Sequence, residues 1–122
     1  ERRTPIPYLA SSPRDARQFV RRTLEALGRP ELGDDAELLV SEVVTNAVLH
    51  GGGSFAPVSV SRTDDGVRVE VTDPGGAFDP HPDAFDVSTP GGLGLGIVDR
   101  LAARWGIVPV PPGKVVWFEL SA

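Results

Sequence analysis

The apolar positions of this chain recur with two different periods, and each period predicts one kind of element. Over residues 12–28 and 34–53 they recur every three or four positions, as on one face of an amphipathic α-helix. The same spacing predicts a third helix over residues 95–105. Asp34 or Asp35 is expected to cap the second helix, because an aspartate side chain accepts hydrogen bonds from the first backbone amides.

Alternation of apolar and polar residues, the period of a half-buried strand, marks the second kind of element. It predicts four strands, over residues 58–61, 67–73, 107–110 and 114–120. The prolines in residues 1–10 allow at best a short edge strand there, and the turn at 64–66 predicts a hairpin. Together the elements predict an α/β fold, a two-layer sandwich of a mostly antiparallel sheet with three helices on one face.

The second predicted helix carries a polar stripe on a mostly apolar surface. Its apolar arc comprises Ala36, Leu39, Val40, Val43, Val44 and Ala47. On the other side, Glu42, Asn46 and His50 stand at i, i+4 and i+8, with neighbours about 6 Å apart along the axis. Leu38 and Leu49 border this stripe, so we expect it to lie against other protein or a ligand rather than in open water.

The second predicted strand ends in a carboxylate that points inward. Val67, Val69 and Val71 share its buried face, and Asp73 has the same parity. An unpaired charge is costly there, so we expect a hydrogen-bonding partner. Beyond it, residues 74–96 combine prolines and glycines with little periodicity, which is typical of either a functional lid or disorder.

Composition narrows the class of protein further. A chain of 122 residues, 40% hydrophobic and 24% charged, is expected to form one globular domain spanning residues 1–122. A net charge of −5 argues against nucleic acid as a partner, because phosphates require a basic face. The chain has no cysteine, which fits the cytosol, and no apolar run long enough to span a membrane. We therefore expect a cytoplasmic protein without a membrane segment.

Three motifs in this order resemble those of the GHKL ATPase superfamily, whose members share the Bergerat ATP-binding fold. The segment ELLVSEVVTNAVLHG is similar to the asparagine box, VTDPGG to the first glycine box and GGLGLGIVDRLA to the second. The tail GKVVWFEL is similar to the closing strand of the family. Within the superfamily, the chain most resembles the small anti-sigma-factor serine kinases and their actinobacterial relatives, from about Pro13 to Leu120.

The resemblance implies a role for each polar group of the stripe and for the inward aspartate. Asn46 would coordinate Mg²⁺ through its side-chain oxygen, a hard ligand of the kind that this ion takes. Glu42 would act as the general base toward the attacking hydroxyl. Asp73 would accept a hydrogen bond from the adenine amino group of ATP. His50 would anchor the helix end, approach the lid or have a purely structural role.

The glycines of both glycine boxes have implied roles as well. Gly75 and Gly76 would let the backbone pass close to the base. In the segment Gly92-Leu93-Gly94-Leu95-Gly96, backbone amides and the following helix N-terminus would face the phosphates of ATP.

The chain also departs from the pattern of the family. Ala77 takes the place of the last glycine in the first glycine box. Lys114 followed by Val115 stands where related closing strands often place a threonine hydroxyl near the adenine. The lid over residues 74–96 contains no lysine or arginine, so phosphate charge would rest on Mg²⁺, backbone amides and His81.

The resemblance therefore implies an ATP- and Mg²⁺-dependent serine/threonine protein kinase. Such proteins bind a sigma factor and phosphorylate a STAS-domain antagonist on serine, and a homodimer is expected from the subfamily. One alternative is a nucleotide-binding partner-switch module with little or no kinase activity, which the lid without basic residues favours. Another is the ATP-binding domain of a histidine kinase, although this sequence contains no phospho-accepting dimerisation helix and His50 lies inside the asparagine box.

Overall fold

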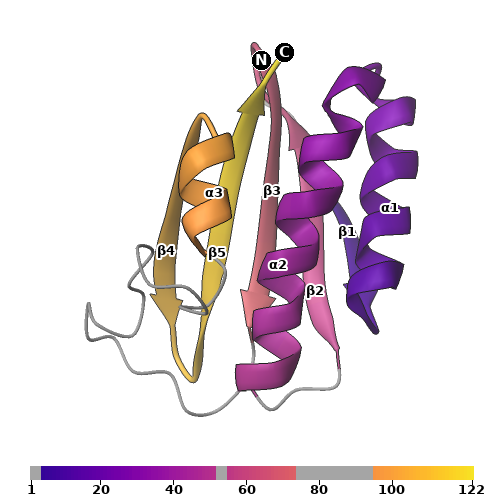
Figure 1. Cartoon of the computed structure of the whole chain (residues 1–122). Coiled ribbons are helices and arrows are strands. Elements are labelled where there is room, and N and C mark those ends of the chain that lie inside the picture. The colour runs from indigo at the N-terminus through magenta and orange to yellow at the C-terminus, as the bar shows by residue number, and fades with distance from the viewer. Residues whose placement is uncertain (1–3, 52–54, 74–94) are drawn as a thin grey trace.

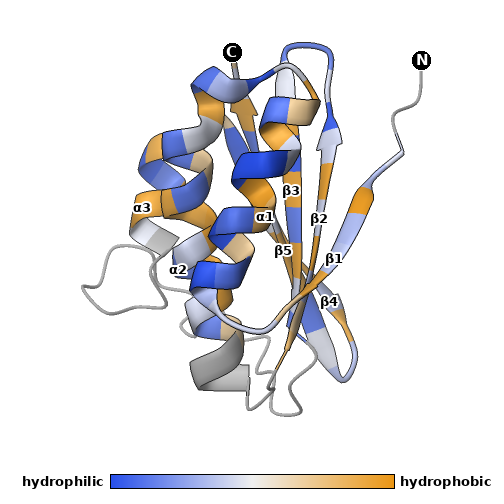
Figure 2. Cartoon of the chain, turned by 90° about the vertical axis from the view of Figure 1, so that its right-hand side faces the viewer, coloured by the Kyte–Doolittle hydropathy of each residue, from blue (hydrophilic) through white to orange (hydrophobic). Residues whose placement is uncertain are grey.

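One antiparallel sheet of five strands carries the described helices on one of its faces (Figure 1). The computed structural model describes residues 4–51, 55–73 and 95–122. In chain order the elements are β1 (Ile6–Ala10), α1 (Pro13–Ala26), the 3-10 turn η1 (Pro30–Leu32), α2 (Gly33–Gly51), β2 (Ala56–Arg62), β3 (Gly66–Asp73), α3 (Leu95–Leu101), β4 (Arg104–Val110) and β5 (Gly113–Ser121). The strand order is β1-β2-β3-β5-β4. Helices and strands form two layers (Figure 2), which confirms the predicted α/β sandwich.

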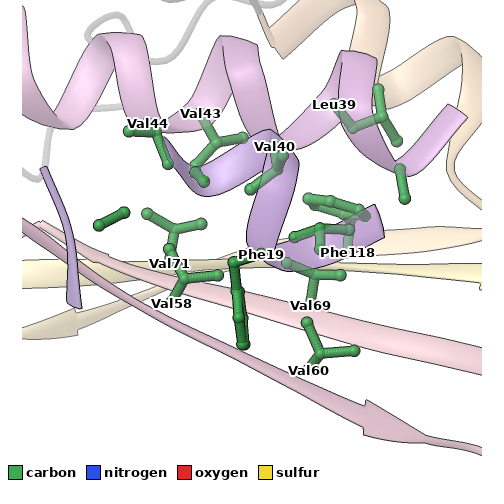
Figure 3. Packing of buried hydrophobic residues seen from close by; sticks show 14 of the residues in the cluster. Phe19, Leu39, Val40, Val43, Val44, Val58, Val60, Val69, Val71 and Phe118 are labelled. Atoms are coloured by element: carbon green, nitrogen blue, oxygen red, sulfur yellow. The ribbon is translucent and has the colours of Figure 1, made fainter. Parts of the chain in front are cut away.

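The hydrophobic core fills the space between the helices and the sheet. The apolar arc predicted for α2 is buried at every position. In Figure 3, Val43 and Val44 of α2 lie over Val58 and Val71 of the central strands. Burying one such side chain stabilises a fold by roughly 1.5–3 kcal/mol, so this layer fixes α2 over the sheet. No helix in the described ranges is long and apolar enough to cross a membrane.

The first helix, α1, begins and ends at the residues whose chemistry favours such ends. The Ser12 hydroxyl accepts a hydrogen bond from the backbone N–H of Asp15 at 3.0 Å and caps the helix. After Leu27 the chain turns at Gly28, whose φ of 77° is left-handed and therefore favours glycine. The two ends of α1 set the path of the chain from β1 into α1 and from α1 toward α2.

The predicted cap of α2 by Asp34 or Asp35 is wrong. The helix already begins at Gly33, because η1 runs directly into it and the Gly33 N–H donates to the carbonyl of Pro30. Both aspartates therefore lie in the first helical turn, where a carboxylate interacts favourably with the helix dipole. Asp34 also pairs with Arg21 of α1 at 2.7 Å, which ties the two helices together.

The third helix is shorter than its sequence pattern predicts. α3 ends at Leu101, and Arg104 and Trp105, which we expected in the helix, belong to β4. The backbone N–H of Ala103 donates to a carbonyl of β5 at 2.8 Å, and Trp105 pairs in register with Phe118. Pairing with β5 therefore lengthens β4 and shortens α3 relative to the prediction.

The face of the sheet away from the helices carries a network of charged side chains. Arg68 of β3 donates to Glu70 at 2.8 Å and to Glu119 of β5 at 3.0 Å. Arg104 of β4 pairs with the same Glu119. The Arg68 guanidinium also lies 4.1 Å from the ring centroid of Trp117. The centre of this outer face is therefore polar, whereas the inner face is packed with valines.

Acid should weaken the junction between β1 and α1 through Asp15. The Tyr8 hydroxyl donates to this carboxylate at 2.6 Å and the Ser11 N–H donates at 2.9 Å, which lowers the pKa of Asp15 below its usual 3.8. Because the folded pKa is the lower one, the carboxylate stabilises the fold above about pH 4 and loses this contribution as the pH falls through the folded pKa. Urea midpoints measured below about pH 4 should therefore fall less steeply for Asp15→Asn than for the parent chain.

A second variant separates the hydrogen bond from the charge. Tyr8→Phe keeps the ring but removes the hydroxyl, so the pKa of Asp15 should move back toward its usual value and the acid slope should become intermediate. Identical slopes in all three chains would show that this junction does not contribute to acid sensitivity.

Candidate functional site

The C-terminal half of α2, which carries the polar stripe, and the end of β3 point toward the same end of the sandwich. Figure 1 shows the two elements running in the same direction, so that both end at one edge of the molecule. Val44 lies over Val71 (Figure 3), and Asn46 and Asp73 each follow two residues further along their elements. The fold thus brings an amide and a carboxylate from distant parts of the sequence to one end of the molecule.

Asn46 holds a buried polar atom that the described residues leave without a hydrogen bond. Its side-chain Nδ2 is shielded from solvent and has no partner among them. Burying a polar group in this way costs roughly 1–3 kcal/mol. No described group fixes which end of the amide takes this position, so the side-chain oxygen can occupy it equally well. This amide is therefore suited to bind an incoming polar ligand or a cation.

Glu42 stands one turn before Asn46 on the same side of α2, as the spacing predicts. It is half-buried and accepts no hydrogen bond from a residue in the described part of the chain. Its carboxylate oxygens are therefore available to accept a proton. Leu38, which borders the stripe, is 43% exposed, so within the described residues no protein covers the stripe at that position.

Asp73 is buried at the end of β3, which confirms its inward parity. It is 4% exposed, and its Oδ2 accepts a hydrogen bond from Nζ of Lys114 at 2.6 Å. The two residues are register partners in the antiparallel pair of β3 and β5. The parity of Asp73 predicts a partner without identifying it. The sequence pattern that could have identified this partner lies in β5. There Lys114 has the same parity as Val116 and Phe118 and therefore lies on the inner face of the sheet.

Several predicted site residues lie outside the described part of the chain, namely Gly75, Gly76, Gly92, Leu93 and Gly94. His50 lies in α2, but the prediction for its side chain falls outside the described structure, and Leu95 is the first residue of α3. Gly96 is the second residue of α3 and is half-buried. Leu95 and Gly96, the last two residues of the predicted lid, therefore belong to α3.

The side chains that could bind a metal ion in the described residues fit one only together with a ligand such as a phosphate. Within residues 4–51, 55–73 and 95–122, no group of three or more histidine, aspartate or glutamate side chains gathers to hold a metal ion. Mg²⁺ commonly binds through one or two protein oxygens and completes its shell with substrate phosphates and water. The buried amide of Asn46 is such a single oxygen donor.

Fold and site together characterise this protein. It is a two-layer sandwich in which β3 ends in the buried carboxylate of Asp73, and the helix α2 above the sheet carries the amide of Asn46 and the carboxylate of Glu42. The family model of the histidine kinase-like ATPase domain matches residues 7–120, which is nearly the whole chain. The chain therefore belongs to the histidine kinase-like ATPase domain family, and ATP is the ligand that this membership indicates. A comparison with curated proteins gives no match to the chain.

Proposed function

We propose that this chain is an ATP- and Mg²⁺-dependent serine/threonine protein kinase of the anti-sigma-factor type. It phosphorylates a STAS-domain antagonist on serine and binds a sigma factor, and its nucleotide state decides which partner it holds. The observation that carries the proposal is that Glu42 and Asn46 share one side of α2, while α2 and β3, which ends in Asp73, end at the same edge of the sandwich. Membership of the ATPase family supports the nucleotide, and the residues at this end of the fold support the roles below.

In this proposal Asn46 lies at the phosphate end of the nucleotide and Asp73 at the adenine end. The Asn46 oxygen would hold Mg²⁺, which supplies positive charge against the triphosphate. Asp73 accepts a hydrogen bond from the exocyclic amino group of adenine. Asp73 is shielded from water, as is the Nδ2 atom of the Asn46 amide, so a hydrogen bond made at either place is electrostatically stronger than it would be in solvent.

Glu42 supplies the proton acceptor for phosphoryl transfer. Its carboxylate takes the proton of the substrate serine hydroxyl as the new O–P bond forms and the bond from the γ-phosphate to ADP breaks. For phosphoryl transfer this contribution is smaller than positioning and charge neutralisation, which remain the tasks of Asn46 and the phosphate-binding backbone.

A second candidate function is a nucleotide-binding switch that does not turn over. Residues 74–96 contain no lysine or arginine, and the Lys114 ammonium donates to Asp73 at the base end of the proposed site. Few protein cations are thus available to stabilise a transferring phosphoryl group. This function keeps nucleotide-dependent partner binding and lacks phosphotransfer.

The Glu42→Gln variant should distinguish these functions. It should bind ATP with nearly the affinity of the parent chain but transfer labelled γ-phosphate to purified STAS-domain proteins roughly 100-fold more slowly. Glu31→Gln is the matched control, because Glu31 is exposed on η1 and the same change there should leave the transfer rate unchanged. Parental rates in Glu42→Gln would exclude Glu42 as the base. Magnesium-dependent ATP binding without transfer by the parent chain would support the switch.

A further inference from the structure

The ion pair of Asp73 and Lys114 is placed differently from the other ion pairs of the described residues. The side chains of Asp73 and Lys114 are 6% and 13% exposed, and both project from the sheet toward the helices. The pairs of Arg68 and Arg104 lie on the outer face, and Arg21 pairs across the surface between α1 and α2. Burying two charges costs several kcal/mol per ion before their attraction is counted, which a purely apolar pair would avoid.

We propose that Lys114 is a second base-reading group, and that the site accepts purine nucleotides with a 6-oxo group as well as ATP. This inference rests on the proposed function, in which Asp73 contacts the adenine. It assigns to Lys114 a contact with the base in addition to its hydrogen bond with Asp73.

The chemistry of the pair supports this assignment. An ionised carboxylate can only accept hydrogen bonds, whereas an ammonium group can only donate them. A lone carboxylate selects adenine, because the 6-amino group donates, and repels the 6-oxo group of hypoxanthine or guanine. With the Lys114 ammonium 2.6 Å from the carboxylate, an acceptor and a donor stand side by side.

Such a pair is complementary to both kinds of purine edge. In adenine the 6-amino group donates and the neighbouring N1 accepts. In hypoxanthine and guanine the 6-oxo group accepts and N1–H donates, so the order is reversed. The carboxylate has about four lone-pair sites and the ammonium has three protons, so their mutual hydrogen bond alone does not use up the capacity of either group.

The position of the pair in the fold is compatible with reading a base. Asp73 is the last residue of β3 and Lys114 the second residue of β5, so both lie at the end of the sheet where α2 also ends (Figure 1). Their side chains project toward the layer of helices in which α2 lies. A purely structural ion pair in the middle of the sheet would have no such access.

Calorimetric titration of the parent chain with ATP and with inosine triphosphate, both with Mg²⁺, tests the proposal. Inosine triphosphate differs from ATP by a 6-oxo group and a proton on N1. We expect the two dissociation constants to lie within about tenfold of each other, since one hydrogen bond to a charged group accounts for a factor of that size. A preference for ATP greater than about 100-fold would overturn the inference without any variant.

Two substitutions of Lys114 sharpen the test. Lys114→Met removes the donor to adenine N1 and to the 6-oxo group, so both nucleotides should bind more weakly. Inosine triphosphate should lose more, at least about tenfold, because its 6-oxo group then faces only the carboxylate. Lys114→Arg keeps a cationic donor on a longer, planar side chain and should retain more affinity for inosine triphosphate than Lys114→Met. If Lys114→Met does not fold, the comparison of the two nucleotides on the parent chain still tests the proposal. Arg104→Gln is the control, because it removes a cation from the outer face and should change neither constant. Unchanged affinities of Lys114→Met for both nucleotides would show that Lys114 does not contact the base.

Failure of the inference can be told apart from failure of the proposed function. If the parent chain binds ATP but rejects inosine triphosphate, only the role of Lys114 is wrong. If the folded parent chain binds neither nucleotide, the proposed function fails, and the inference fails with it.

Discussion

Asp73→Asn should abolish measurable ATP binding and also lower the free energy of unfolding by about 3 kcal/mol. The asparagine has nearly the shape of the aspartate but lacks the charge that accepts strongly from the adenine amino group. In the same step the Lys114 ammonium, 13% exposed, loses the carboxylate that compensates for its burial. Calorimetric titration with ATP and Mg²⁺ measures the first effect, and urea unfolding without nucleotide measures the second.

Arg104→Gln is the matched control for this prediction, because it also breaks an ion pair of the sheet. The Arg104 side chain is 72% exposed, so the loss should stay below about 1 kcal/mol and ATP binding should not change. Parental ATP affinity in Asp73→Asn would exclude Asp73 from the base site. Parental stability would mean that the pair with Lys114 contributes little to the fold.

Asn46→Ala should have the opposite effect on the fold. Truncation removes a polar atom that is buried without a partner among the described residues, so the free energy of unfolding should stay level or rise. The affinity for ATP with Mg²⁺ should nevertheless fall by at least about 100-fold, because even indirect partners of a metal ion contribute 10–100-fold. Titrations with Mg²⁺ and with EDTA measure the binding, and urea unfolding measures the stability.

The matched control is Leu38→Ala, two turns earlier on the same stripe. Leu38 is 43% exposed and should affect neither property strongly. In EDTA, Asn46→Ala and the parent chain should bind ATP with the same weak affinity, because the metal that distinguishes them is absent. A loss of stability of more than about 1 kcal/mol in Asn46→Ala would show that Asn46 has a structural role instead.

The sequence predicted best those features that depend on a single element. The burial of the α2 arc and of the valines in β3 follows from the helix and strand periods alone, because a face that is apolar throughout has to be covered. The inward direction of Asp73 follows from the same parity. Likewise, the spacing of four residues between Glu42 and Asn46 is enough to predict that they are neighbours on α2.

Features that depend on a distant partner were predicted less well. Trp105 fits a helical pattern locally, but register with Phe118 of β5 places it in a strand. The start of α2 depends on η1, whose 3-10 turn ends at Leu32 and leads into Gly33. Lys114 could be assigned to Asp73 only once the register of β3 and β5 was known.

In the proposed function, the lifetime of the protein depends on the supply of nucleotide. Bound ATP and Mg²⁺ would satisfy the buried amide of Asn46, and a ligand at 100 times its Kd stabilises a fold by about 2.7 kcal/mol through mass action. Domains of this size are stable by only about 5–15 kcal/mol, so that share is large. When nucleotide runs short, the unfolded fraction rises by about 100-fold, and proteases act on that fraction. The abundance of the protein would then follow the concentration of nucleotide.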